Sequence, residues 1–191
     1  MKHVSLSIIR DEHLALSAML RSMLMLIDKS HRDGSPPAFD VLRAMLLYID
    51  EFPERRHHQH ENHLLFPMIR IQVPDLTATL DKLESDHAKG EANVRALNHL
   101  LLAWEVLGEP RRAAFEDGAK RYVDAYLKHM ALEESEILPA AQAHLSDEQW
   151  RTLDHAFQSD QDPLTGRPPP DEFKPLFKRI VMTAPAPVGL G

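Results

Sequence analysis

Two segments of the sequence, aligned without gaps, each place a histidine four residues before a glutamate and ten residues before a proline. The matching residues are His57, Glu61 and Pro67 in the first segment and His129, Glu133 and Pro139 in the second. On a helix, residues i and i+4 lie on the same face, so each pair presents an imidazole and a carboxylate in one direction. This combination of nitrogen and oxygen ligands suits iron, manganese or zinc.

Two further histidines, His13 and His87, each follow an acidic residue within an apolar stretch of helical period. The two His-Glu pairs begin 44 and 42 residues after them. The sequence therefore predicts two helical hairpins related by a pseudo-two-fold axis, each with one lone histidine and one His-Glu pair. A single histidine of this kind could be a hydrogen-bonded core residue, but the repeated spacing favours a metal site.

The two repeated glutamates, Glu61 and Glu133, indicate that the site holds two ions. Burying an unpaired carboxylate is costly, whereas carboxylates from facing helices of a bundle can bridge a pair of metal ions. Four imidazoles, two bridging carboxylates and a bridging oxide or hydroxide would still leave at least one coordination position open. We expect that position to take a small diatomic or peroxide ligand.

Three more residues are weaker candidates as ligands. Glu91 follows His87 by one helical turn on the same apolar stripe, so it is either a ligand or hydrogen-bond partner or a solvated residue. His58 and His60 compete for a further histidine role, because each lies within one turn of a member of the first His-Glu pair. The alternative for both is a polar residue at the end of the bundle.

Helical periodicity dominates the rest of the chain, and no strand is predicted. Apolar residues recur at spacings of three and four in four stretches, which are residues 6–27, 38–71, 76–104 and 115–137. Short polar or glycine- and proline-containing breaks separate the stretches. We therefore predict an all-α, up-down antiparallel four-helix bundle over residues 1–145. Pro53 and Pro67 should kink or divide its second helix.

Residues 146–191 are predicted to form a helical appendage with two additional C-terminal helices. Ser146 and Gln149 form a capping box that begins a short helix ending near residue 157. After a loop rich in Asp, Gly and Pro, residues 173–181 form a second amphipathic helix. Its apolar face should pack on the bundle or on a partner chain, and a homo-oligomer is left open.

Composition excludes several classes of function. Lys and Arg total 22 against 29 Asp and Glu, and this charge of −7 argues against nucleic-acid binding and against attraction to an anionic membrane. The absence of cysteine excludes disulfides, thiolate zinc sites, iron–sulfur clusters and thiol catalysis. Residues 1–30 lack the apolar centre of a signal peptide, so we expect a cytoplasmic protein. The 12 histidines are the main excess in the composition.

The combined pattern resembles the hemerythrin-like, or HHE cation-binding, family, and in particular its bacterial branch. The resemblance covers residues 1–145 and depends on His13, His57, Glu61, His87, His129 and Glu133, with the flanking phrases Arg56-His57-His58, Leu65-Phe66-Pro67 and Asp86-His87. It implies a hemerythrin-like four-helix bundle that holds two iron ions, as a non-haem di-iron centre with an oxygen-derived bridge. Family members handle dioxygen, nitric oxide or iron in differing ways.

Two departures from the oxygen-carrying members of the family argue against reversible oxygen transport. Those proteins have a second histidine at the position of Glu91, and their last carboxylate is an aspartate five residues after the histidine that matches His129. The expected function is therefore interaction of a di-iron centre with dioxygen or related oxidants in sensing, protection or iron handling. The alternatives are a di-iron peroxidase or oxidase, and an iron-storage or iron-sensing module.

Overall fold

The computed structural model describes residues 3–159, 162–166 and 168–190, and all regular structure within these ranges is helical. The α-helices are α1 (Val4–Asp33), α2 (Phe39–Ile49), α3 (His58–His60), α4 (Phe66–Gln72), α5 (Thr77–Leu107), α6 (Arg112–Leu132), α7 (Leu138–His144), α8 (Asp147–Ser159) and α9 (Lys174–Thr183). Three π-helical segments, η1 (Asp50–His57), η2 (Glu61–Leu65) and η5 (Glu133–Ile137), join some of them. Short 3₁₀ turns are η3 (Pro74–Leu76), η4 (Glu109–Arg111), η6 (Pro163–Thr165) and η7 (Asp171–Phe173). In this part of the chain, no helix combines the length and apolar character needed to span a bilayer.

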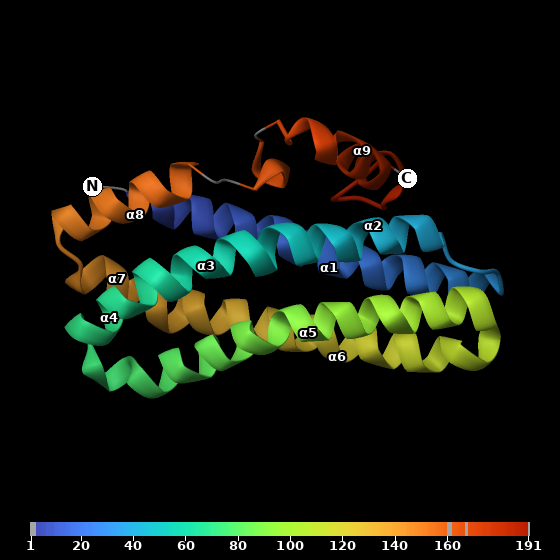
Figure 1. Ribbon diagram of the computed structural model, residues 1–191, viewed down its shortest axis with the longest axis horizontal. Helices are drawn as coiled ribbons and strands as arrows, with labels where there is room; N and C mark the ends of the chain where they lie inside the picture. Colours follow the sequence, from blue (N-terminus) through green and yellow to red (C-terminus); the bar gives the residue numbers. More distant parts are fainter. Residues whose placement is uncertain (1–2, 160–161, 167, 191) are drawn as a thin grey trace.

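The predicted four-helix bundle is confirmed. Helix α1 packs against α2 and α6, while α5 packs against the same two elements from the other side (Figure 1). Successive long helices run in opposite directions, and α4 meets α7 at the far end. Helix α1 ends at Gly34, which adopts the left-handed conformation with φ of 60° that a glycine accommodates without strain.

The second helix of the bundle is divided into α-helical and π-helical segments around its two prolines. Neither Pro53 nor Pro67 ends the helix, because the backbone stays in the right-handed helical region from α2 to α4. It widens into π-helix instead. Pro67 has no N–H for the carbonyl of His63, four residues earlier, and that carbonyl lies within η2. Pro139 has the same relation to Ser135 within η5, so each repeated proline follows a repeated π-helical segment.

Two hydrophobic cores fill the bundle, with a layer of buried polar residues between them. One core contains Leu16 to Ile27 of α1 and Val94 to Trp104 of α5, and the other contains Leu6 to Ile9 of α1. The polar layer comprises Glu12, His13, Glu54, His58, Glu61, His87, His129, Glu133 and Asp162. The bundle has four helical columns, which are α1, α2 to α4, α5, and α6 to α7. Each column therefore passes from one core to the other through this layer.

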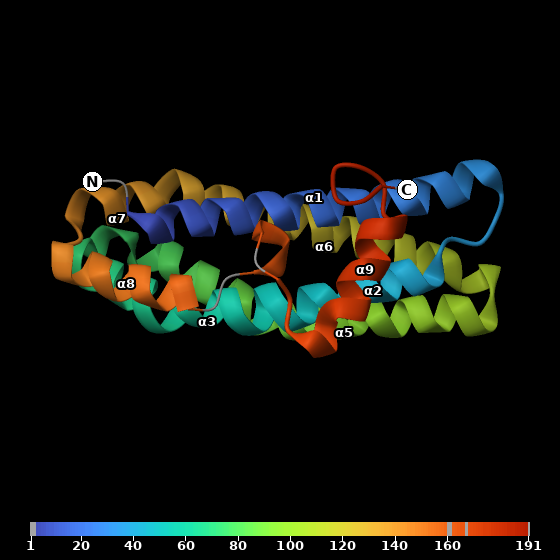
Figure 2. The same cartoon turned by 90° about the horizontal axis from the view of Figure 1, so that it is seen from above.

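The C-terminal helices complete both cores on one side of the bundle. The capping box at Ser146 and Gln149 forms as predicted, with each residue accepting a hydrogen bond from the other's backbone N–H. Helix α8 lies on α1 and contributes apolar residues to one core, and α9 crosses α2 and contributes Phe177 and Ile180 to the other (Figure 2). The apolar face predicted for residues 173–181 thus packs on the bundle within this chain.

Candidate metal centre

The six principal candidate ligands converge in the polar layer from all four columns of the bundle. His13 comes from α1, His87 from α5 and His129 from α6. His57 ends η1, while Glu61 and Glu133 each begin a π-helical segment. The two glutamates are 0% and 1% exposed. π-Helical turns are frequent at functional sites, and here they place both carboxylates in the interior.

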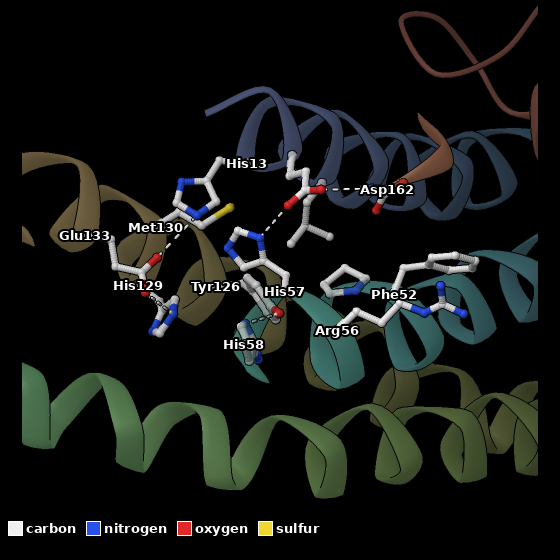
Figure 3. A pocket seen from close by; sticks show the side chains of 13 residues that line it. His13, Phe52, Arg56, His57, His58, Tyr126, His129, Met130, Glu133 and Asp162 are labelled. Carbon is white, nitrogen blue, oxygen red and sulfur yellow. Dashed lines mark hydrogen bonds and ion pairs between the residues drawn. The ribbon is translucent and has the colours of Figure 1, made fainter. Parts of the chain in front are cut away.

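Each of the two buried carboxylates faces two different sets of histidines. Glu61 has one oxygen 3.2 Å from Nε2 of His57 and the other 3.5 Å from Nε2 of His87. Glu133 has one oxygen 3.3 Å from Nε2 of His13 and the other 3.1 Å from Nε2 of His129 (Figure 3). Each carboxylate therefore lies between two groups of histidines, with His13 and His57 on one side and His87 and His129 on the other.

Among the residues that the structure describes, three groups of side chains have ligand atoms close enough to hold an ion. They are His13, His57 and Glu61; His58, His87 and His129; and Glu61, His87 and Glu133, each with its ligand atoms within 4.8 Å of one another. The Nε2 atoms of His87 and His129 are 2.9 Å apart. Two neutral imidazoles can share at most one proton in such a contact, which makes this a suitable place for a cation.

Of the two competing histidines, His58 lies in the cluster. Its ring is buried, stacks on that of His87 at 3.8 Å, and has Nε2 3.0 Å from the hydroxyl of Tyr126. His60 lies against Phe157 of α8, with ring centroids 5.1 Å apart, and belongs to none of the three groups. The two residues separate because His60 is two residues further along a helix and so faces another direction.

Of the two alternatives for Glu91, the structure agrees with the solvated residue and not with a ligand. Its side chain is 41% exposed and forms an ion pair of 2.6 Å with Arg95, one turn away on α5. The inward stripe of α5 continues through Gly90 instead. A Cβ atom on Gly90 would lie only 2.0 Å from the carboxylate of Glu54, so this carboxylate occupies the space that a side chain would take.

Glu54 is a buried carboxylate that the sequence reasoning missed. It lies 3.2 Å from Nδ1 of His58 and accepts a hydrogen bond from the hydroxyl of Tyr122. Burial raises the pKa of its carboxyl group to about 6, although the hydrogen bond from Tyr122 opposes the shift. The spacing Glu54 to His58 is itself i to i+4, which is the signal that could have identified it.

Oxygen acceptors outside the cluster orient three of its imidazoles. Nδ1 of His57 is 2.7 Å from Glu12, Nδ1 of His87 is 2.7 Å from Asn62, and Nδ1 of His13 is 3.0 Å from Glu134. The sequence reasoning noted Glu12 only as the acidic residue before His13 and did not single out Asn62. An Nδ1–H that donates outward leaves the Nε2 lone pair directed at the centre. Metal-binding histidines are commonly held this way.

The carboxylates of the cluster carry negative charge that a protein interior would not hold without positively charged partners. Burial lowers the pKa of His13, but the neighbouring carboxylates of Glu133 and Glu134 outweigh this effect and raise it to about 9. Burial opposes the charged form of Glu133 as well, yet the neighbouring histidines hold its pKa well below the usual range. Both oxygens of Glu61 and of Glu133 lack a hydrogen bond within the described chain. Bound cations would satisfy these oxygens, so the residues present fit a metal pair.

Two cavities reach the cluster from opposite sides. A small one of about 20 Å³ is lined by His13, His57 and Glu133 (Figure 3). Asp162 also lines it: its backbone N–H donates to Glu12 at 2.8 Å, and its carboxylate accepts a hydrogen bond from Tyr48. The other cavity, of about 380 Å³, lies along α5 and α6 and ends at His58, His87 and His129. The C-terminal segment therefore packs over one side of the cluster and leaves a large cavity on the other.

A comparison with protein families matches the hemerythrin HHE cation-binding domain to residues 4–141. The match includes all six principal candidate ligands together with His58 and Glu54. No curated protein matches the chain.

Proposed function

This chain belongs to the hemerythrin HHE cation-binding domain family, and from that premise we propose that its polar layer binds two iron ions bridged by Glu61 and Glu133. The observation that carries the proposal is the orientation of the carboxylates. Each turns one oxygen toward His13 or His57 and the other toward His87 or His129. Carboxylates of this kind define dinuclear sites in helical bundles.

The histidines divide into two sets around the carboxylates. His13 and His57 would hold one ion, and His58, His87 and His129 would hold the other. Manganese and zinc suit the same ligands, although a site rich in imidazole and carboxylate that handles oxygen species favours iron. When bound, the iron pair supplies one-electron redox chemistry and at least one coordination position that the protein does not fill.

The surrounding residues shield a small ligand from water at both ends of the polar layer, while the cavity along α5 and α6 leaves one flank accessible. The two hydrophobic cores exclude solvent above and below the layer. Tyr126 places its hydroxyl at His58, and Glu54 adds a carboxylate beside the same ring. A negative charge beside the ions favours their oxidised form. We therefore propose sensing of, or protection against, dioxygen, nitric oxide or peroxide rather than reversible oxygen transport.

Metal analysis after growth with added iron tests the dinuclear site. We expect two ions per chain in the natural protein and a sharp loss in Glu61→Ala and Glu133→Ala, because each carboxylate serves both ions. The matched control is Glu136→Ala, an exposed glutamate on the same π-helical segment as Glu133, which should keep both ions. Two ions retained in the Glu61→Ala, Glu133→Ala double variant would contradict the assignment.

A second test follows the redox behaviour. The protein is reduced without oxygen, exposed to dioxygen, and then freed of the gas while its charge-transfer bands are recorded. We expect oxidation that persists after the gas is removed. Full return to the reduced spectrum would indicate an oxygen carrier instead.

An oxidase or peroxidase is the second candidate, and the cavity of about 380 Å³ at His58, His87 and His129 favours it. Sustained consumption of peroxide with an added electron donor would support the enzyme over the sensor. A single turnover without further consumption would support the sensor.

A further inference from the structure

We propose that the cavity between α5 and α6 binds an amphipathic organic carboxylate, with its head group near the cluster and its apolar chain directed away from it. The proposal extends the proposed function, because His58, His87 and His129 form the inner end of this cavity. The cavity and its charges belong to the chain itself, so the binding can be measured with or without metal.

The size of the cavity exceeds what a diatomic ligand needs. Its volume is about 380 Å³, whereas a water-sized molecule occupies about 30 Å³. Pockets that bind small organic molecules start at about 300 Å³. Along α5 the lining residues run from Asp86 to Leu100, and fourteen steps along the helix at about 1.5 Å each span about 20 Å. The cavity is therefore long enough for an extended chain.

The polarity of the walls changes along this length. At the outer end the lining is apolar, with Ala96, Leu97 and Leu100 on α5 facing Gly118 on α6. A Cβ atom on Gly118 would lie 3.1 Å from the side chains of both leucines, so the glycine lets these two side chains pack closely against α6. An alkyl or aryl group fits here without burying a polar atom.

Two cations lie between the apolar end and the imidazoles. Lys89 and Arg121 both line the cavity and are exposed, and neither forms an ion pair within the described chain. Several other cations of the same two helices are paired, Arg95 with Glu91 and Lys128 with Asp124, whereas Lys120 on α6 lies outside the cavity lining. Two unpaired cations beside an apolar channel predict an anionic head group on an apolar body.

The acidic residues of the cavity favour a single negative charge on that head group. Glu54 lies at the inner end with a hydrogen bond from Tyr122, and Asp86 pairs with Lys82 at 2.7 Å. These carboxylates would repel a dianion such as a phosphate monoester more strongly than a monoanion. A carboxylate also matches the forked donors of Arg121.

Octanoate is a suitable probe, with 1-octanol and octyl phosphate as comparisons. Binding to the metal-free and the iron-containing protein is measured by calorimetry, and metal content is determined on the same samples. We expect octanoate to bind both forms, and to bind more tightly than either comparison compound. The metal content tests the proposed function, and the binding of octanoate tests the cavity. A protein that holds no iron but binds octanoate would contradict the first proposal and support the second.

Charge and shape variants test the location. Lys89→Gln with Arg121→Gln should raise the Kd of octanoate about tenfold and leave that of 1-octanol nearly unchanged. The control, Arg95→Gln with Lys128→Gln, makes the same change in net charge on the same helices outside the cavity and should have little effect. Ala96→Phe, at an exposed position that lines the cavity, should abolish binding of both compounds.

Three results would overturn the proposal. They are absence of octanoate binding in both forms of the natural protein, an equal loss of affinity in the control pair, and tighter binding of octyl phosphate than of octanoate. The third result would show that the cavity takes a different class of head group.

Discussion

Glu54 reaches the backbone of α5 because residue 90 is a glycine. The carboxylate lies where the Cβ of any other residue would stand, at 2.0 Å from that position. It is held there by Tyr122 and lies beside His58. A glycine in the middle of a long helix lowers helix stability, and here it provides the space for a buried carboxylate next to the candidate metal centre.

Replacement of Gly90 by alanine should therefore have opposite effects in two backgrounds. In the natural protein, Gly90→Ala should lower the free energy of unfolding by about 1–3 kcal/mol, because the new methyl group displaces Glu54. In a Glu54→Ala background the space is free, and the same change should raise stability by up to about 1 kcal/mol through helix propensity. Denaturant unfolding of the four proteins measures both values. Equal effects in the two backgrounds would show that Gly90 and Glu54 do not interact.

Asp162 should give the folded protein a distinct dependence on pH. Burial raises the pKa of its carboxyl group from 3.8 to about 6, so the folded state holds the proton more tightly than the unfolded chain. The stabilisation by this proton is complete below about pH 4 and is lost as the pH rises through 6. Asp162→Asn cannot ionise, so its stability relative to the natural protein should increase between pH 4 and 6, by at most about 3 kcal/mol.

Denaturant unfolding at several pH values tests this expectation. Asp171→Asn is the control, because that side chain is 92% exposed. It should track the natural protein across the range. If Asp162→Asn also tracks the natural protein, the carboxyl group of Asp162 does not titrate in this interval.

At the scale of elements, periodicity predicts a straight α-helix well and a π-helical segment poorly. Helix α5 buries Leu80, Leu83, His87, Gly90, Val94, Leu97, Leu101 and Trp104 at alternating spacings of three and four. The sequence showed this stripe, but Glu91 was placed on it because glycine carries no hydropathy signal. The residue that fills the gap is Glu54, from another helix, and no local pattern can report such a packing partner.

The His-Glu pairs were predictable because their two residues lie about one turn apart. Over so short a distance, a π-helical segment changes the relative direction of two side chains only a little. His58 and His60 both lie within one turn of a member of the first pair, so spacing alone could not decide which of them points inward. The prolines signalled a disturbance, and its form depended on the surrounding helices.

The packing of α9 leads to a prediction about stability. Phe177 contacts the rings of Tyr48 and Phe52 at centroid distances of 5.8 Å and 5.4 Å, and Ile180 is fully buried. Phe177→Ala should lower the free energy of unfolding by about 3–5 kcal/mol. Met182→Ala on the same helix is the control, because Met182 is 59% exposed, and it should lower the free energy of unfolding only slightly.

Removal of residues 160–191 should also reduce solubility, because it uncovers the apolar surface on which α9 packs. A truncated chain that stays soluble and equally stable would contradict this role for α9.

In the whole molecule, the polar layer separates two hydrophobic cores that share the same four columns. Without metal, the layer holds several imidazoles and buried carboxylates with unsatisfied oxygens. The proposed metal pair would bind the folded arrangement only, so iron should raise the melting temperature, by an amount that grows with its concentration above Kd.

Thermal unfolding with and without iron tests the coupling of the two cores. The protein containing iron should have a higher melting temperature and unfold in one transition. The Glu61→Ala, Glu133→Ala variant should have the same melting temperature with and without iron. Equal melting temperatures for the two forms of the natural protein would place the metal outside the polar layer.

The unequal covering of the two sides of the cluster has a consequence for exchange kinetics. On the side of α1, the small cavity has Asp162 and Glu12 in its lining, whereas the cavity along α5 and α6 extends about 20 Å from the histidines. A chelator such as ferrozine would then extract iron through the α5 and α6 side. The Ala96→Phe change should slow extraction, and a substitution at Asp162 should have little effect on it. The extraction half-time would thus report the openness of a single face of the bundle.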